Sequence, residues 1–346
     1  MQFWSTNKTT INMSVLQGSI IGVLLFLIFI NDQHHSSSLH SIIFADDNSV
    51  LARGSDLADL YNRVNIELQK LAVWYRANKL ALNLNKTKYM VFHAKGKAID
   101  TSDFKLFVNN NDLDSNQIPS QIVELERISN RSSVQYIKVL GLHLDENLTF
   151  DLHIKHVLNK VSSALFSMKR SSSMLTTKAK KLLYYSLVHS HINYCLNIYC
   201  STSKANLCKV YKLQKKAIRI IADAKYNAST SNLFKEYKIL PLEQLIQYNK
   251  LCFMHLYSNN LLPEAFEGLW PVNWSIQGFA GLRNEYDLYI PYARSENIKR
   301  FPFIEFAKCW NNLQNSQDET TVDFRSTPNR LHFKRKLKDY LIDLIT

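Results

Sequence analysis

The chain has 346 residues, of which 46% are hydrophobic, and this content suffices for one or two packed domains. Its 42 lysines and arginines outnumber its 29 acidic residues, which gives a formal charge of +13. This excess favours binding of a polyanion, since neutralising phosphates releases counterions, although a basic soluble protein without such a partner fits equally well. The five cysteines form no paired framework and match no usual zinc spacing, which argues against a disulfide-rich secreted domain.

An uninterrupted apolar run covers residues 20–30. It has about 11 residues, whereas a membrane span needs about 20. It also lacks a charged leader and a small-residue cleavage site. We therefore expect a helix buried beneath a sheet, with Ser19 as its N-cap and Asn31-Asp32 at its end, in an intracellular protein (cytoplasm and nucleus) that is not secreted.

Two adjacent carboxylates, Asp46 and Asp47, follow a short apolar segment. Residues 41–45 and 49–52 read as paired strands, with Asp46, Asp47 and Asn48 in the turn. Mg²⁺ takes one or two carboxylates and fills its other positions with water and phosphate, so such a tip suits a divalent cation. An Asp-Asp-Asn sequence is also ordinary turn chemistry, and the surrounding motifs decide between the two interpretations.

The following segments predict an alternation of helix and strand. An apolar helical stripe runs through residues 56–83, with Asp56 as its cap. Its members are Leu57, Leu60, Tyr61, Val64, Leu68, Leu71 and Tyr75. Residues 88–92 and 136–144 read as strands, and the polar residues 95–131 between them read as an irregular surface insertion.

From residue 151 onward the pattern is mainly helical. The predicted helices cover residues 152–168, 177–189, 205–223 and 242–257, with Pro241 at the start of the last. On the third of these helices, spacings of three and four place Lys209, Lys212, Lys216 and Arg219 on one face. This face can follow a nucleic-acid backbone, and a solvated helix face is an equally good interpretation. Residues 333–341 read as a basic amphipathic helix that caps the helical part, with RNA or a membrane surface as alternative partners.

Four motifs occur in the order found in a known family. They are Gln17-Gly18-Ser19, Phe44-Ala45-Asp46-Asp47, a segment at residues 78–92 that contains Lys86, and Val139-Leu140-Gly141-Leu142. This order resembles the palm of reverse transcriptases from non-LTR retrotransposons of the jockey type. The resemblance extends from about Val15 to Arg283-Asn284 and residues 307–313.

The resemblance implies an α+β fold. It places a partial polymerase palm, an antiparallel sheet with packed helices, at residues 1–150, a mainly α-helical thumb at 151–260 and a C-terminal tail region at 261–346. It implies RNA-directed DNA polymerase activity, which is nucleotidyl transfer by two Mg²⁺ (or Mn²⁺) ions. The implied partners are an RNA template, a DNA primer and deoxynucleoside triphosphates, and no membrane.

The resemblance also implies residue roles. Asp46 is the direct metal ligand, with Asp47 in support, and Lys86 acts as a general acid on pyrophosphate or contacts phosphate, although a solvated loop lysine fits nearly as well. The implied nucleotide- and template-binding residues are Gln17, Gly18, Ser19, Phe44 and Ala45, and the implied primer grip is Leu140 and Gly141.

The chain departs from the family pattern before the first motif. The family carries a further catalytic aspartate on a strand there, and residues 1–14 contain no Asp or Glu. Leu16 and Val23 stand where prolines are usual. We therefore expect an N-terminally truncated palm that holds its ions weakly and is inactive as an isolated chain. The alternatives are a non-catalytic nucleic-acid-binding relic of a mobile element and a host protein whose palm is only structural.

Overall fold

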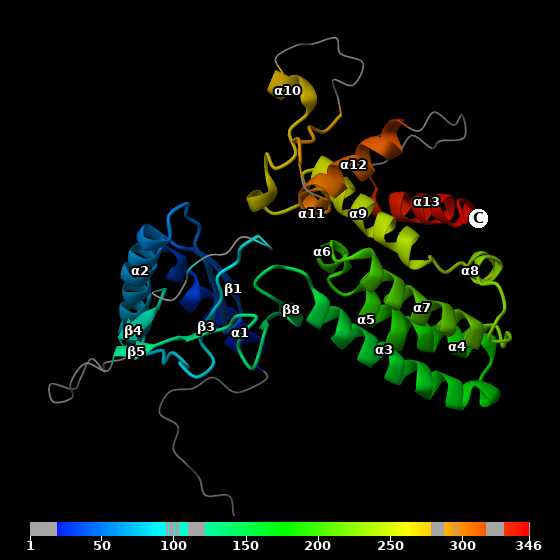
Figure 1. Cartoon of the computed structure of the whole chain (residues 1–346), viewed down its shortest axis with the longest axis horizontal. Coiled ribbons are helices and arrows are strands. Elements are labelled where there is room, and N and C mark those ends of the chain that lie inside the picture. The colour runs from blue at the N-terminus through cyan, green and yellow to red at the C-terminus, as the bar shows by residue number, and fades with distance from the viewer. Residues whose placement is uncertain are drawn as a thin grey trace, which may run out of the picture. The chain divides into compact units, whose positions relative to one another are not determined.

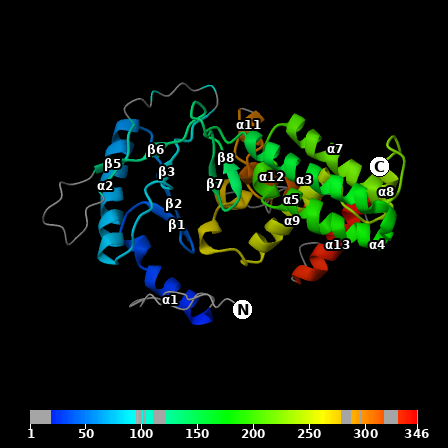
Figure 2. The same ribbon diagram turned by 90° about the horizontal axis from the view of Figure 1, so that it is seen from below.

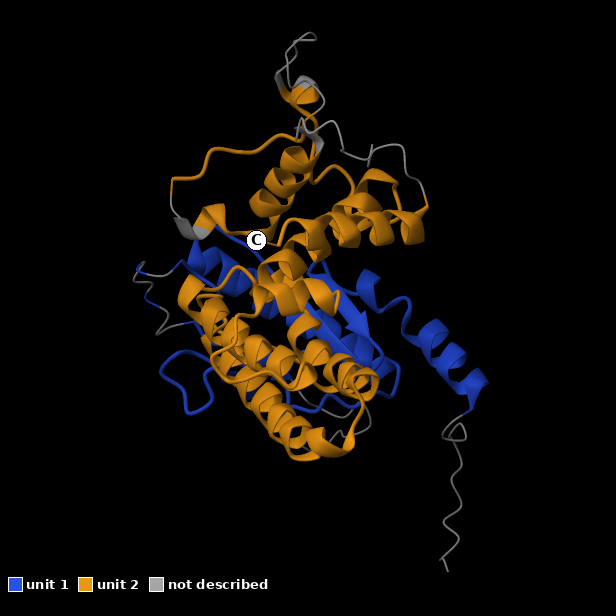
Figure 3. Cartoon of the chain, turned by 90° about the vertical axis from the view of Figure 1, so that its right-hand side faces the viewer, with its two compact units in different colours: residues 1–139 blue, residues 140–346 orange. Residues whose placement is uncertain are grey.

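The computed structural model describes residues 19–94, 96, 100, 104–109, 122–277, 287–294, 296–315 and 329–345. The chain divides into two compact units, residues 1–139 and 140–346, which have different colours in Figure 3. The first unit mixes short strands with helices, and the second is mainly helical (Figure 1). The α+β class is confirmed at this level, while the division into palm, thumb and tail stays a prediction.

The first unit contains short strands that pair locally. Its elements in chain order are α1 (Ile20–Ile30), the 3-10 helix η1 (Gln33–His35), β1 (His40–Phe44), β2 (Asp47–Leu51), α2 (Leu57–Ala77), β3 (Lys88–Tyr89), β4 (Phe107–Asn109), β5 (Ile122–Glu124), β6 (Glu126–Arg127) and β7 (Ile137–Val139). β1 pairs with β2 and β4 with β5, both antiparallel, whereas β3 pairs with β6 in parallel. Among the described residues these strands form separate two-stranded pairs, not the single antiparallel sheet that we predicted.

The helix α2 supplies one wall of the core of this unit. Its predicted apolar stripe is confirmed, because every member is buried or half-buried. The Asp56 carboxylate caps the helix by accepting a hydrogen bond from the Asp59 N–H. The helix ends at Ala77, earlier than predicted. The Leu80 N–H bonds back to the Tyr75 carbonyl and Lys79 takes a φ of +56°, which is a Schellman ending.

The predicted irregular insertion at residues 95–131 is corrected by the structure. Its described ends form β4, β5 and β6, and they bury apolar side chains against α2. Phe104, Leu106, Val108 and Leu125 belong to the same buried cluster as Val64 of α2. The segment therefore contributes core strands, and residues 110–121 lie outside the described part of the chain.

The helix α1 has the predicted bounds but not the predicted burial. Ser19 occupies the N-cap position without a side-chain hydrogen bond, and Ile30 is the buried residue of the helix. Ile20 is 91% exposed, and Val23 and Ile28 are each 65% exposed. Burial was expected because a helix that is apolar on all sides usually lies inside a protein. These exposed fractions show that the expectation of a helix beneath a sheet is wrong for this structure.

The predicted strand at residues 136–144 is broken in two. β7 ends at Val139, and β8 (Leu142–Leu144) begins the second unit. Between them Leu140 and Gly141 have φ values of +46° and +89°. These left-handed conformations end a strand, and the sequence pattern did not reveal them.

The second unit is built from packed helices. After β8 its elements are α3 (Asp151–Ser171), η2 (Ser172–Met174), α4 (Thr177–Leu183), the π-helix η3 (Tyr184–His189), α5 (Ser190–Asn193), α6 (Leu196–Tyr199), α7 (Lys204–Ile221), α8 (Ser231–Glu236), α9 (Leu242–Ser258), η4 (Glu264–Phe266), α10 (Asn273–Gln277), α11 (Glu296–Lys299), α12 (Pro302–Asn315) and α13 (Arg330–Asp343). The predicted helices at 152–168, 205–223 and 242–257 are confirmed as α3, α7 and α9. The predicted helix at 177–189 begins as α4 and continues as η3.

The core of this unit lies among its packed helices. α3 and α7 lie side by side, and α9 packs against both α12 and α13 (Figures 1 and 2). The predicted basic helix at residues 333–341 is confirmed within α13, where Phe333, Leu337 and Leu341 are buried. Within the described ranges, no helix combines the length and apolar character that crossing a membrane requires.

Candidate metal hairpin and basic helices

The two adjacent carboxylates lie at the tip of a regular hairpin. Phe44 pairs with Asp47 across β1 and β2, which leaves Ala45 and Asp46 as the two turn residues. Ala45 takes the left-handed φ of +53° that closes this tight turn. The predicted hairpin is confirmed, but Asp47 and Asn48 belong to β2 and not to the turn.

The hairpin is fixed to α2 through its second strand. The Asn48 side-chain N–H donates to the Tyr75 hydroxyl at 2.8 Å, two residues after Asp46. Val50 of the same strand packs against the buried cluster of the unit. The tip is therefore attached to the longest helix of the unit, and Tyr75 is a supporting residue that the sequence did not single out for this role.

The side chains of Asp46 and Asp47 are both exposed to solvent. Carboxylate oxygens are the ligands that Mg²⁺ takes from proteins, and exposure leaves room for water and phosphate to complete the coordination. Across the residues that the structure describes, no group of three or more His, Cys, Asp or Glu side chains forms a ready metal site. The hairpin thus fits a cation that is held by two carboxylates and by ligands from outside the described residues.

The outer face of the hairpin is apolar as well as acidic. Phe44 is 62% exposed, and Ile42 and Leu51 are also exposed on the same face. Phe44 and Ala45 therefore stand on an open surface beside Asp46, where contact with a ligand is sterically possible. Of the other predicted nucleotide-binding residues, Gln17 and Gly18 lie outside the described residues, and Ser19 directly precedes α1.

Lys86 lies in an exposed turn before β3. The Lys86 N–H donates to the Asn83 carbonyl at 3.0 Å and to the Asn83 side-chain oxygen at 3.2 Å, which fixes the backbone of the turn. Its ammonium forms no ion pair with any described residue. The structure therefore presents Lys86 as an exposed cation, and its role toward phosphate stays a prediction.

The predicted primer grip is a strained turn in the second unit. The Tyr194 hydroxyl donates a hydrogen bond to the Leu140 carbonyl, and a Cβ on Gly141 would meet the Tyr194 ring at 3.4 Å. Gly141 combines this close contact with a φ of +89°, so this is a position where glycine is favoured. Tyr194 lies 54 residues beyond Leu140, and no local sequence signal links the two residues.

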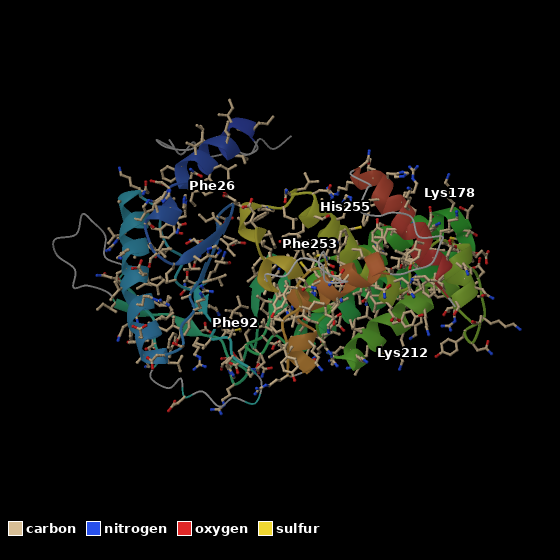
Figure 4. The ribbon with its side chains drawn as sticks, turned by 90° about the horizontal axis from the view of Figure 1, so that it is seen from above. Phe26, Phe92, Lys178, Lys212, Phe253 and His255 are labelled. Atoms are coloured by element: carbon tan, nitrogen blue, oxygen red, sulfur yellow. The ribbon has the colours of Figure 1, made fainter. Side chains whose placement is uncertain are left out.

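Three of the four residues on the predicted basic face of α7 are exposed to solvent. Lys209, Lys212 and Lys216 are exposed, and Lys212 lies at the edge of the ribbon in Figure 4. Arg219 is half-buried, and its Nε–H donates to the Ala228 carbonyl at 3.0 Å. The three lysines can therefore contact phosphates, whereas Arg219 also supports the loop that follows α7.

The motif at residues 307–313 lies on α12, in the second unit. Trp310 and Asn311 are buried on α12. The Asn311 amide exchanges two hydrogen bonds with the backbone of Leu288, at 3.0 Å and 2.9 Å. This tail motif thus holds two chain segments together. The other tail motif, Arg283-Asn284, lies outside the described residues.

Three known proteins align with about two thirds of the chain. A probable RNA-directed DNA polymerase from transposon BS of Drosophila melanogaster is 25% identical over 243 residues, which are 67% of this chain. The RNA-directed DNA polymerases from mobile element jockey of Drosophila melanogaster and Drosophila funebris are 21% and 22% identical over 67% and 66% of it. The aligned segment spans 24% to 25% of the length of these relatives. No family model and no solved structure matches the chain.

The names of the aligned relatives agree with the family that the motif order resembles. All three carry the name of an RNA-directed DNA polymerase from a mobile element. This chain is therefore similar to the RNA-directed DNA polymerases of the mobile elements BS and jockey.

Proposed function

We propose that this chain forms the palm hairpin and the helical nucleic-acid-binding part of an RNA-directed DNA polymerase. The observation that carries the proposal is the hairpin tip, which presents Asp46 and Asp47 to solvent on a strand anchored to α2. The names of the aligned relatives support the reaction class. The substrates are then an RNA template, a DNA primer and deoxynucleoside triphosphates.

In this proposal the hairpin supplies ligands for divalent metal. Asp46 is the direct ligand of Mg²⁺ or Mn²⁺, and Asp47 supports it from the first position of β2. When bound, two such ions activate the 3′-hydroxyl of a primer and stabilise the leaving pyrophosphate. Phe44 and Ala45 provide the exposed surface beside the tip, and Lys86 provides a cation for the triphosphate. Residues Gln17, Gly18 and Ser19 belong to the same nucleotide site in this proposal.

The second unit contributes the grip on the template and primer. Lys209, Lys212 and Lys216 contact backbone phosphates, which positions nucleic acid without reading its sequence. The turn at Leu140 and Gly141 holds the primer, and its shape depends on the Tyr194 hydrogen bond.

One observation favours a second candidate function. Two-metal catalysis needs more ligands than two adjacent carboxylates, and the described residues add no third acidic or histidine ligand to the hairpin. Synthesis then depends on a carboxylate from elsewhere, and the isolated chain binds nucleic acid without extending a primer. If no other segment or partner supplies that carboxylate, the protein is a non-catalytic nucleic-acid-binding relic of a mobile element.

Primer extension separates these cases. The purified chain is incubated with a DNA primer on an RNA template in Mg²⁺ or Mn²⁺, beside Asp46→Asn and the charge-matched control Asp343→Asn, whose carboxylate is exposed on α13. We expect all three chains to bind template–primer in a salt-sensitive manner and none to extend it. Extension by the parent and the control, but not by Asp46→Asn, would show that the metal site is complete without another carboxylate. Failure to bind template–primer would overturn the proposal in both forms.

A further inference from the structure

The helix that begins as α4 changes its hydrogen-bond pattern in the middle. It continues as the π-helix η3 and then as α5. A π-helical turn is rare and is frequently found at functional sites. Here it places Tyr185 and His189 on the wall of a cavity of about 180 Å³, which also touches α9 and α13.

The cavity has an apolar floor and polar walls. Ile239, Leu240 and Leu245 form the floor. Its volume is far above the roughly 10–15 Å³ that one water molecule needs, so a tetrahedral oxyanion can enter.

The polar walls supply hydrogen-bond donors. The Asn249 side-chain N–H donates to the Asn193 side-chain oxygen at 2.6 Å, which orients the Asn193 amide so that its own NH₂ remains a donor. Burial raises the pKa of the Tyr185 hydroxyl, so it remains a protonated donor at neutral pH, whereas the Tyr248 hydroxyl shares a hydrogen bond with Cys252.

Positive charge accumulates around the same cavity. His189 and Lys338 line it, and no carboxylate does so within the described residues. Burial and then the nearby Lys338 lower the pKa of His189. Burial lowers the pKa of Lys338, and the nearby Lys181 and Lys238 lower it further. Asp339 acts in the opposite direction.

The described part of the chain does not pair with these lysines. Lys181, Lys238 and Lys338 form no ion pair with any residue that the structure describes. A half-buried cation such as Lys338, with the half-buried Lys181 and the exposed Lys238 near it, is costly unless an anion joins it. The arrangement therefore calls for an anion from outside, and donors in the walls are in place to bind its oxygens.

We propose that this cavity, formed by Tyr185, His189, Asn193, Leu245, Tyr248 and Lys338, is a phosphate-binding site. Lys338 supplies the positive charge for the phosphate, and the neutral His189 ring, the Asn193 amide and the Tyr185 hydroxyl donate hydrogen bonds to its oxygens. The phosphate belongs either to a polynucleotide backbone or to free phosphate in solution. The site lies in the second unit and depends on neither Asp46 nor a metal ion.

The test compares two lysines of one helix in the full chain. Lys338→Met removes the cation in the cavity, and Lys336→Met removes the same charge two residues earlier, outside the cavity lining. His189→Gln is a second cavity variant that retains size and hydrogen bonding. All measurements contain a chelator, so they are independent of the metal hairpin, and circular dichroism establishes that each variant is folded.

Two probes distinguish the source of the phosphate. Inorganic phosphate is followed by the shift in the melting temperature at constant ionic strength, and a labelled 20-residue oligouridylate is followed by fluorescence anisotropy. We expect Lys338→Met to weaken binding by about tenfold, as for a lost hydrogen bond to a charged group, and Lys336→Met to weaken it less than about twofold. If Lys338→Met weakens the binding of both probes, the site takes the phosphate of a polynucleotide backbone. If Lys338→Met weakens the binding of inorganic phosphate alone, the site takes free phosphate. Equal behaviour of Lys338→Met and Lys336→Met with both probes would overturn the proposal.

Discussion

The side-chain N–H of Asn48 donates to the hydroxyl of Tyr75 at 2.8 Å, and this bond joins the strand that follows the acidic tip to the helix α2. The position of Asp46 and Asp47 relative to the core of the first unit therefore depends on a residue about 30 positions later in the chain. The single oxygen of the Asn48 amide is buried without a partner among the described residues, so the side chain depends strongly on the contact that its nitrogen makes.

Replacing Tyr75 by phenylalanine tests this connection. Tyr75→Phe leaves the Asn48 amide unsatisfied, and we expect a loss of about 1–2 kcal/mol in the free energy of unfolding. Hydrogen-exchange mass spectrometry of the peptides of β2 and α2 measures the loss locally. Tyr61→Phe is the matched control, since the Tyr61 hydroxyl makes no hydrogen bond to a residue that the structure describes, and it should change the same amides by less than about 0.5 kcal/mol. Equal effects of the two substitutions would mean that the hairpin is anchored elsewhere.

The turn at Leu140 and Gly141 makes a second structural prediction. Gly141→Ala places a Cβ 3.4 Å from the Tyr194 ring at a φ of +89°, and we expect a cost of about 1–2 kcal/mol. Tyr194→Phe removes the hydrogen bond to the Leu140 carbonyl and should weaken template–primer binding without unfolding the helices. Tyr226→Phe, at an 82% exposed tyrosine, is the control. Unchanged binding in Tyr194→Phe would separate this turn from the primer grip.

Glu67 gives the first unit a defined dependence on pH. The hydrogen bond from Lys70, followed by the backbone hydrogen bond from Ser38, holds the pKa of Glu67 at about 2, below its ordinary 4.5. Since the unfolded chain takes up this proton first, the stabilisation is complete above pH 4.5 and is lost as the pH falls toward 2. We expect the unfolding free energy of the first unit to decrease between pH 5 and pH 3. In Glu67→Gln this decrease should be smaller, as measured by urea unfolding, and an identical pH profile would contradict the assignment.

How much of this arrangement could be predicted from the sequence depends on the range of the interactions. The hairpin at Asp46 and the helix α2 follow from local alternation, turn residues and capping, and both are confirmed. The bounds of α1 were also predicted, but its burial was not, because an apolar helix shows that it needs a neighbour without showing which segment provides one. The break at residues 140–141 is the short turn between the paired strands β7 and β8, and Gly141 was its one local signal. The hydrogen bond from Tyr194 to this turn is a tertiary contact, which leaves no local pattern.

The exposed lysines of α7 make a prediction about salt dependence. Replacing Lys209, Lys212 and Lys216 together by glutamine should lower RNA affinity and reduce the slope of log K against log salt by up to about 2, since each phosphate contact on single strands contributes about 0.7. A control with Lys155, Lys178 and Lys225 replaced by glutamine carries the same net charge and alters exposed lysines elsewhere. If the control lowers the slope equally, general charge and not this face of α7 determines binding.

In the proposed function the tip at Asp46 and Asp47 holds a divalent metal ion. Fe²⁺ can replace Mg²⁺ at such a site, and with ascorbate and peroxide it cleaves the backbone beside the bound ion. We predict cleavage of the full chain close to residue 46, competed by Mg²⁺, which disappears in Asp46→Asn and persists in Asp343→Asn. Cleavage at another place in the chain, or unchanged cleavage in Asp46→Asn, would contradict it.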